Sequence, residues 1–169
     1  MTEPNPTESI ERSVHEALES LGARYEVMAC DPALADTAAF CAHYGVDPGK
    51  SANAILVASR KEPKKYAVCL VLATTKLDVN KKVAELLGVR KLSFASGEET
   101  VAVTGMMIGG VTPFGIPPGI PIYVDSRIIG LDEVVIGGGS RSSKLRIAPE
   151  IFTRMPGVQV IDRLALDRV

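Results

Sequence analysis

The segment of this chain best suited to chemistry is residues 105–121, GMMIGGVTPFGIPPGIP. It holds five glycines and four prolines and has no charged residue. Glycine lets other groups approach the backbone closely, whereas proline fixes φ at about −65°. A rigid, partly buried loop of this composition could line a pocket with its backbone N–H and C=O groups. A tight apolar connection between two core strands would fit the same composition.

The order of residues within this loop narrows the type of ligand. Gly109 and Gly110 have no Cβ, Thr112 offers a hydroxyl and Pro113 stiffens the chain. Such a loop suits an ester or amide that is held by backbone groups. The phosphate-binding patterns GxxxxGK[ST] and GxGxxG are absent, and no lysine lies within the loop.

Residues 137–147, GGGSRSSKLRI, are expected to form a second glycine-rich turn. Arg141, Lys144 and Arg146 place three positive charges next to the free backbone N–H groups of the triple glycine. Together these groups could bind an anion such as a terminal phosphate. A mobile, solvated turn is the alternative that the sequence leaves open.

Nucleophilic and metal chemistry have little support in the sequence. His15 and His43, the two histidines, fall on predicted helices, and the GxSxG and HExxH patterns do not occur. Cys30, Cys41 and Cys69 are odd in number and lack CxxC spacing, so we expect small buried apolar residues. We therefore expect no metal and no other cofactor.

The charge of the chain limits its partners. A net charge of −1 argues against binding nucleic acid through many phosphates, but it is compatible with binding one end of an RNA. Lysines 61, 64 and 65, like lysines 81 and 82, are expected on solubilising faces; the first run would touch phosphates if it lay at a pocket mouth. No apolar run reaches the ~18 residues of a membrane span, and no export signal is visible, so we expect a cytoplasmic protein.

Apolar periodicity and capping residues place these motifs in a fold in which helices and strands alternate. Helices are expected at residues 9–21, 37–44, 79–87 and 97–104, and a helix-like segment at 149–155. Strands are expected at residues 25–29, 52–59, 66–73, 120–125, 133–140 and 158–162, the second and third as a hairpin. The sequence thus predicts an α/β (α+β) fold: a tail at 1–8, then one domain at 9–169 with a mixed, mostly antiparallel, barrel-like sheet surrounded by helices.

The order of these motifs resembles a known family. The stretches ADTAAFCAHYGVDPGKSANAILVAS, YAVCLVLATTKLDVNKKVAELLG, GMMIGGVTPFGIP, IPIYVDSRI and VVIGGGS follow one another as in the YbaK/ProX family of aminoacyl-tRNA deacylases. That family is related to the editing domain of bacterial prolyl-tRNA synthetases. The resemblance covers about residues 20–165, and its most specific part is the GxxxP element at 109–113, continued by Phe114 and Gly115.

The resemblance implies an activity and a set of site residues. The activity is hydrolysis of the ester that joins a small wrong amino acid, such as Ala, Cys or Ser, to tRNA, including tRNA-Pro. Loop backbone groups, a water and the terminal hydroxyl of the tRNA do the chemistry. The implied partners are the aminoacylated 3′ end of a tRNA and an aminoacyl-tRNA synthetase, with no DNA and no membrane. The implied catalytic residues are Asn53, Gly109 and Gly110, and the substrate-binding residues are Thr112, Pro113, Phe114, Gly115, Asp125, Gly138 and Ser140.

One position departs from the family pattern. Members usually carry a lysine on the strand after the DPG-like turn, and Asn53 stands at that place in SANAIL. Lys50 lies at an odd offset, so on a strand it would point to the opposite face. Asn53 can donate and accept hydrogen bonds but brings no fixed charge. Two hypotheses follow: a deacylase in which Asn53 orients the terminal ribose or water, and a non-catalytic module that binds an aminoacyl or nucleotide-like ligand.

Overall fold

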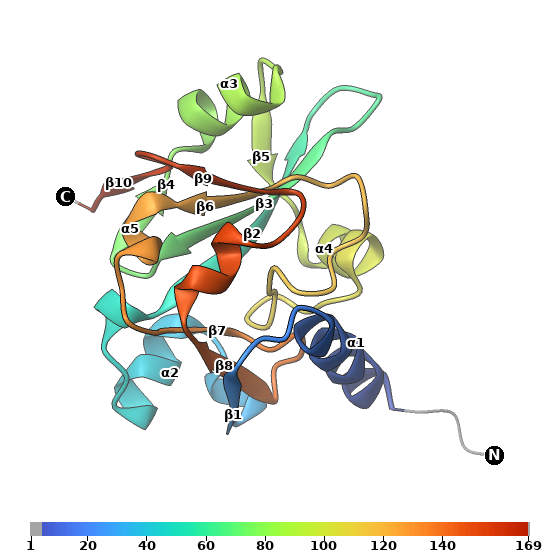
Figure 1. Cartoon of the computed structure of the whole chain (residues 1–169). Coiled ribbons are helices and arrows are strands. Elements are labelled where there is room, and N and C mark those ends of the chain that lie inside the picture. The colour runs from blue at the N-terminus through green and yellow to red at the C-terminus, as the bar shows by residue number, and fades with distance from the viewer. Residues whose placement is uncertain (1–4, 169) are drawn as a thin grey trace.

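The computed structural model describes residues 5–168 and arranges its strands in three sheets (Figure 1). The five-stranded sheet has the order β5 (Leu92–Phe94), β2 (Ala52–Ser59), β3 (Tyr66–Leu72), β6 (Ile122–Asp125) and β9 (Val158–Ile161). Here β2 pairs antiparallel with β5 and β3, whereas β6 runs parallel to β3 and β9. The antiparallel three-stranded sheet contains β1 (Tyr25–Ala29), β8 (Ser143–Ile147) and β7 (Val134–Gly137). A ribbon of β10 (Ala165–Asp167) and β4 (Thr75–Leu77) completes the set.

The helices surround these sheets. They are α1 (Pro6–Ser20), α2 (Thr37–Tyr44), α3 (Ala84–Leu87), α4 (Gly97–Thr104) and α5 (Ser126–Ile129). A π-helical segment, Val79–Val83, leads into α3, and 3-10 segments occupy Pro32–Leu34, Pro48–Lys50 and Pro149–Thr153. Glycines in the left-handed conformation, Gly45, Gly88 and Gly105, end α2, α3 and α4.

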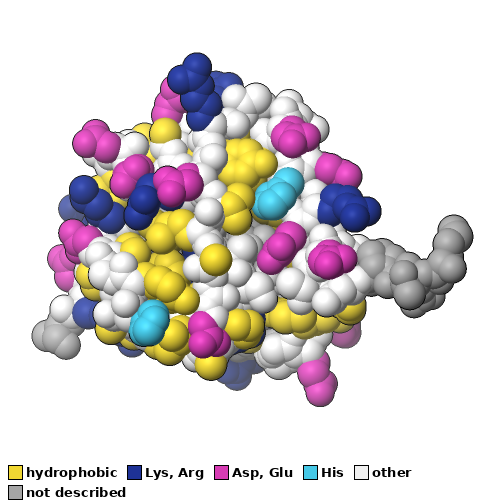
Figure 2. Space-filling model, turned by 90° about the horizontal axis from the view of Figure 1, so that it is seen from below, with side chains coloured by type: hydrophobic (Ala, Val, Ile, Leu, Met, Phe, Trp, Pro, Cys, Tyr) yellow, Lys and Arg dark blue, Asp and Glu magenta, His cyan; other side chains and the backbone are white. Residues whose placement is uncertain are grey.

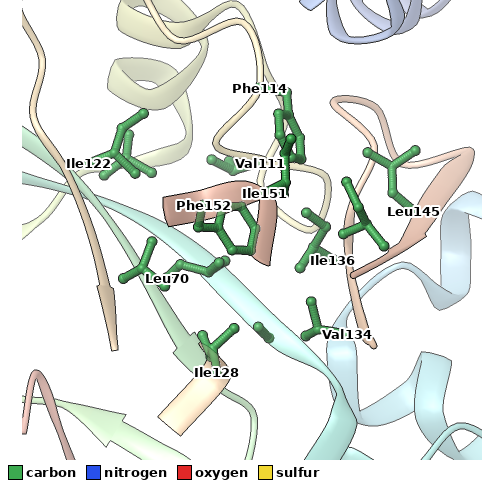
Figure 3. Close-up of a cluster of buried hydrophobic side chains, with 14 of the residues drawn as sticks. Leu70, Val111, Phe114, Ile122, Ile128, Val134, Ile136, Leu145, Ile151 and Phe152 are labelled. Atoms are coloured by element: carbon green, nitrogen blue, oxygen red, sulfur yellow. The ribbon is translucent and has the colours of Figure 1, made fainter. Parts of the chain in front are cut away.

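The five-stranded sheet buries apolar side chains on both faces. One core lies between it and the three-stranded sheet, and α1, α4 and α5 contribute to its edges. Figure 3 shows its centre, where Leu70, Ile136, Phe114 and Phe152 converge and the two phenylalanine rings stack. The second core lies under residues 79–87 and the β4–β10 ribbon. On the outer face of the three-stranded sheet, α2 packs through Phe40.

The predicted fold class is confirmed, with two corrections. Within the described residues the strands form no closed barrel: three sheets take the place of one, and a single parallel bridge, Ser51 to Val135, joins the two larger ones. In addition, α1 begins at Pro6, inside the predicted tail, because the Asn5 side chain accepts the Thr7 N–H and proline suits a first helical turn. Residues 1–4 lie outside the described residues.

The second glycine-rich segment was predicted wrongly as a turn over its whole length. Residues 143–147 form β8, the central strand of the three-stranded sheet. Leu145 and Ile147 alternate with polar residues and face the main core. That period-2 pattern was present in the sequence, but the preceding glycines and serines outweighed it in the prediction.

The two glycine-rich segments pack against each other, backbone on backbone. The Gly139 N–H donates to the Gly110 carbonyl oxygen at 2.6 Å, and a Cβ on Gly137 would lie 2.4 Å from the Val111 oxygen. A Cβ on Gly110 would lie 2.1 Å from the Ser140 oxygen. Glycine is required at these contacts because no side chain fits between the two backbones.

Gly110→Ala should therefore lower the free energy of unfolding by about 1–3 kcal/mol, since one of two packed backbones must move. Gly130→Ala is the matched control, because its Cβ would meet nothing nearer than the Arg127 oxygen at 3.7 Å. Urea denaturation of both variants measures the difference. Equal stability of the two would contradict the close backbone packing.

Candidate functional site

Lys144, on β8, is a lysine that the fold buries almost completely, with 5% of its surface exposed. Its Nζ donates to the carbonyl oxygen of Gly109 at 2.5 Å and to that of Ala35 at 2.6 Å. The same atom lies 5.4 Å from the centre of the Phe40 ring. One side chain therefore ties the GxxxP loop to the residues just before α2.

The Nζ of Lys144 is held by polar groups without forming a salt bridge to a described residue. Among the described residues, no carboxylate forms an ion pair with its Nζ, and carbonyl dipoles and the face of Phe40 take that place. Burial lowers the pKa of Lys144, because removal from water disfavours the charged form. Burial also raises the pKa of the neighbouring Cys30 thiol, and the positive charge of Lys144 opposes that rise.

Arg141 makes a second connection between the same two segments. Its Nη1 donates to the Ile108 carbonyl oxygen at 2.8 Å and to Asp36 Oδ1 at 3.1 Å, and its Nε donates to the Pro32 oxygen. Asp36 stands at the N-cap position of α2, but its carboxylate pairs with Arg141 and caps no backbone N–H. The two basic side chains thus hold residues 108 and 109 against residues 32–36.

The next residue along the chain, Thr37, extends this connection to Asn53. The Thr37 hydroxyl donates to Asn53 Oδ1. Both side chains line a cavity of about 450 Å³ beneath α2. Residues 35–37 therefore join three parts of the candidate site: Lys144 at Ala35, Arg141 at Asp36 and the Asn53 cavity at Thr37.

The Asn53 cavity is mostly apolar and has a charged group from the end of the chain. Among the described residues that line it, Arg168 alone carries a charge, and Arg168 Nε donates to the Thr75 oxygen. The remaining lining residues are Ala38, Cys41, Ala42, Val46, Pro48 and Ala73. A guanidinium at the side of an apolar cavity can pair with one anionic group of a ligand that the cavity holds.

The GxxxP loop lies beside this cavity without lining it. Gly109, at φ 92°, is half-buried, and Gly110, Thr112 and Pro113 are buried. The Thr112 hydroxyl has no hydrogen-bond partner among the described residues. Phe114 belongs to the main core. The sequence left open whether this loop lines a pocket or tightly connects two core strands. The loop is a tight core connection, and Lys144 and Arg141 hold it next to the Asn53 cavity.

Three of the predicted substrate-binding residues have structural partners. Asp125 Oδ1 caps α5 at the Arg127 N–H, and its Oδ2 accepts the Ala165 N–H at 2.8 Å. The Ser140 hydroxyl donates to Glu11 Oε1, and Gly138 packs on Ser143. Gly115 is exposed with φ 86°. The substrate contacts of these residues stay predictions.

The anion site predicted in the second glycine-rich segment divides in the structure. Arg146 pairs with Glu26 and Glu133, away from the loop, so only Arg141 and Lys144 of the three basic residues meet there. All three cysteines are free and buried. His15, on α1, is partly buried against Tyr25.

Within residues 5–168, no group of three His, Cys, Asp or Glu side chains is placed to hold a metal ion. Over the same range, every helix is too short or too polar to cross a membrane.

Sequence reasoning missed Thr37 and Arg168 and placed Lys144 in a glycine-rich turn, either anion-binding or solvated. No motif marks Thr37, and Arg168 reaches the cavity only because β10 pairs with β4. The alternation in SKLRI could have located β8, but alternation alone would have placed Lys144 in solvent. The packing of α2 on the outer face of β8 is what buries it.

A family model for the aminoacyl-tRNA editing domain matches residues 31–155, which include Asn53, Lys144 and both glycine-rich segments. The chain therefore belongs to the aminoacyl-tRNA editing domain family, and the predicted YbaK/ProX membership is confirmed. A curated relative is EbsC of Enterococcus faecalis, provisionally named a Cys-tRNA(Pro)/Cys-tRNA(Cys) deacylase. It is 24% identical over 115 residues, which cover 68% of each chain.

Solved structures have the same fold. A protein provisionally described as a trans-editing enzyme for prolyl-tRNA synthetase superposes with a TM-score of 0.78 at 27% identity, over 99% of this chain and 100% of that one. The protein APE2540 superposes with a TM-score of 0.77 at 23% identity, over 89% of this chain and 97% of that one. The second likeness shows the fold alone.

The buried state of Lys144 predicts a pH dependence of stability. The unfolded chain keeps the lysine proton up to a pKa of 10.5, whereas the folded chain releases it at lower pH. The unfolded state therefore binds more protons in the window just below pH 10.5, and stability rises with pH there. The free energy of unfolding of the wild type, relative to that of Lys144→Met, should increase as the pH rises through this window.

Urea denaturation at several pH values between 7 and about 10.5 measures this difference. Other lysines and tyrosines titrate in the same window, but their contributions cancel between the two proteins. Two curves that stay parallel across the whole window would show that Lys144 titrates alike in both states.

Proposed function

We propose that this chain is a deacylase that hydrolyses the ester between a small mischarged amino acid and the 3′ end of a tRNA. Cysteine, alanine and serine are the candidate amino acids, and tRNA-Pro is the candidate carrier. The observation that carries the proposal is that the chain belongs to the aminoacyl-tRNA editing domain family. Within the matched range, residues 35–37 connect the GxxxP loop, Lys144 and Asn53. The names of EbsC and of the trans-editing protein support cysteine as the amino acid and tRNA-Pro as the carrier.

The reaction needs few groups from the protein. A water oxygen bonds to the ester carbonyl carbon, the bond to the ribose oxygen breaks, and the ribose oxygen takes a proton. In this proposal, as the resemblance to the deacylases implies, the water and the terminal hydroxyl of the tRNA are the reacting groups. The protein's part is to hold the ester and to stabilise the charge that develops on its carbonyl oxygen.

Asn53 is the side chain best placed to contact the ester or the terminal ribose. Because the Thr37 hydroxyl donates to Asn53 Oδ1, the Asn53 amide nitrogen keeps its two N–H donors for a ligand in the cavity. A volume of about 450 Å³ is within the usual range of small-ligand pockets, and Arg168 can pair with the phosphate of the terminal nucleotide.

Lys144 acts in this proposal as a positioning residue. It lies on the far side of residues 35–37 from Asn53 and binds the carbonyl oxygen of Gly109. It therefore orients the loop and gives the site a fixed positive charge that Asn53 does not supply. The uncharged Asn53 stands at the position of the family's usual lysine. Lys144 on β8 and Arg168, which follows β10, supply positive charge instead.

Release of the amino acid from tRNAs mischarged with alanine, cysteine, serine or proline tests the proposal. We expect turnover of at least one substrate, and Asn53→Ala should lower kcat/KM by about a hundredfold, as loss of a preorganised donor does. Gln159→Ala, which removes an exposed amide from β9 of the same sheet, should leave kcat/KM unchanged.

Two results would contradict the proposal in different ways. Saturable binding of aminoacyl-tRNA without turnover by the folded protein would favour the non-catalytic module. Turnover that Asn53→Ala leaves intact would keep the activity but remove Asn53 from the site.

A further inference from the structure

A run of basic side chains leads away from the Asn53 cavity. Arg168, which follows β10, lines that cavity. Leu166 of β10 pairs with Lys76, and Lys76 and Arg60 line the next hollow. Arg60 also lines the hollow beyond, which has a volume of about 520 Å³. Its other basic lining residues are Lys61, Lys65, Arg90 and Lys91. These seven Lys and Arg residues are called the basic track below.

The basic track passes over the β4–β10 ribbon and the edge strand β5, outside the second core that covers one face of the five-stranded sheet. Side chains alternate along β2, so Asn53, Val57 and Ser59 share the face on which the Asn53 cavity lies. Ser59 lines the far hollow, about 20 Å from Asn53 along the strand. Figure 1 shows the two ends of this path: the β2–β3 hairpin loop and α3 at the top, and α2 at the lower left. A strand of several nucleotides can span that distance.

The charges of the basic track are unbalanced. The chain as a whole has a net charge of −1, yet only Asp78 and Glu62 are acidic among the described residues that line the two hollows. Within the described chain, no member of the basic track forms a salt bridge. On the face shown in Figure 2, by contrast, acidic and basic side chains are interspersed. Such a local excess of positive charge attracts a polyanion.

An exposed aromatic ring lies within this run of positive charge. Phe94 on β5 pairs with Val57 of β2 and is 58% exposed. It lines the middle hollow together with Arg60 and Lys76. Its exposed ring provides a surface on which a nucleotide base can stack, and neighbouring cations are compatible with an aromatic face.

We propose that the basic track and Phe94 bind the tRNA strand that continues from the terminal nucleotide in the Asn53 cavity. Phe94 stacks on an unpaired base near the 3′ end, and Arg60, Arg90 and Lys91 contact the phosphates beyond it. This inference rests on the proposed function, since it takes the RNA end in the cavity as its starting point. The track adds affinity for the RNA and takes no part in breaking the ester.

Charge reversal tests the inference. Arg90→Glu/Lys91→Glu should raise KM for mischarged tRNA about tenfold at low salt and reduce the slope of log affinity against log salt by about one to two. Arg12→Glu/Arg24→Glu is the control: it changes the net charge equally at exposed positions outside the track. Hydrolysis of an aminoacyl ester of adenosine, which fills only the cavity, should be the same in all three proteins.

Phe94→Ala tests the stacking contact separately. Loss of one stacked base should weaken binding of single-stranded RNA about tenfold and leave binding of duplex RNA unchanged. An equal effect on both RNAs would remove base stacking from the proposal.

The outcomes separate this inference from the proposed function. If the two double variants have the same KM for tRNA and the same salt slope, the basic track does not bind RNA. If the wild type hydrolyses neither tRNA nor the adenosine ester, the proposed function fails, while the measured tRNA affinities still decide whether the track binds RNA. Tighter binding of duplex DNA than of tRNA would also contradict the proposal that the basic track binds the tRNA strand.

Discussion

The candidate site depends on one buried positive charge. Lys144 has no carboxylate partner among the described residues, so its placement requires that the Gly109 and Ala35 carbonyl oxygens both face it. That requirement fixes the GxxxP loop against the start of α2. Glycines then become necessary, because the loop must also pack on residues 137–140 with no room for a Cβ at Gly110. The rigidity of the loop follows from these contacts more than from its prolines.

The elements that local patterns define were predictable from the sequence. The end of α2 follows from the left-handed Gly45, and the bounds of β2 follow from the apolar run at 52–59. The division into three sheets was not predictable, because strand pairing across long separations leaves no local signal. The same limit applies to the site: Asn53 and the loop could be named, but Lys144 and Arg168 reach it only through pairings of β8 and β10.

In the proposed deacylase, other residues take over the roles of a lysine at position 53. Positive charge comes from Lys144 behind the loop and from Arg168 beside the cavity, and Asn53, paired with Thr37, has N–H donors free for the ligand. Asn53 thereby orients the ligand, whereas Lys144 and Arg168 supply the positive charge. Binding of the rest of the RNA is assigned to a different surface, the basic track, so the cavity itself needs little charge and can select small amino acids by shape.

The most direct test of this account is the steady-state kinetics of Lys144→Met on the mischarged tRNA that the wild type hydrolyses best. Arg146→Met, a basic residue of the same strand that faces Glu26 and Glu133, is the control. The account predicts that Lys144→Met lowers kcat by about tenfold or more, with tRNA affinity unchanged, because Lys144 positions the loop without touching the RNA. A folded Lys144→Met protein with the kcat of the wild type would contradict it.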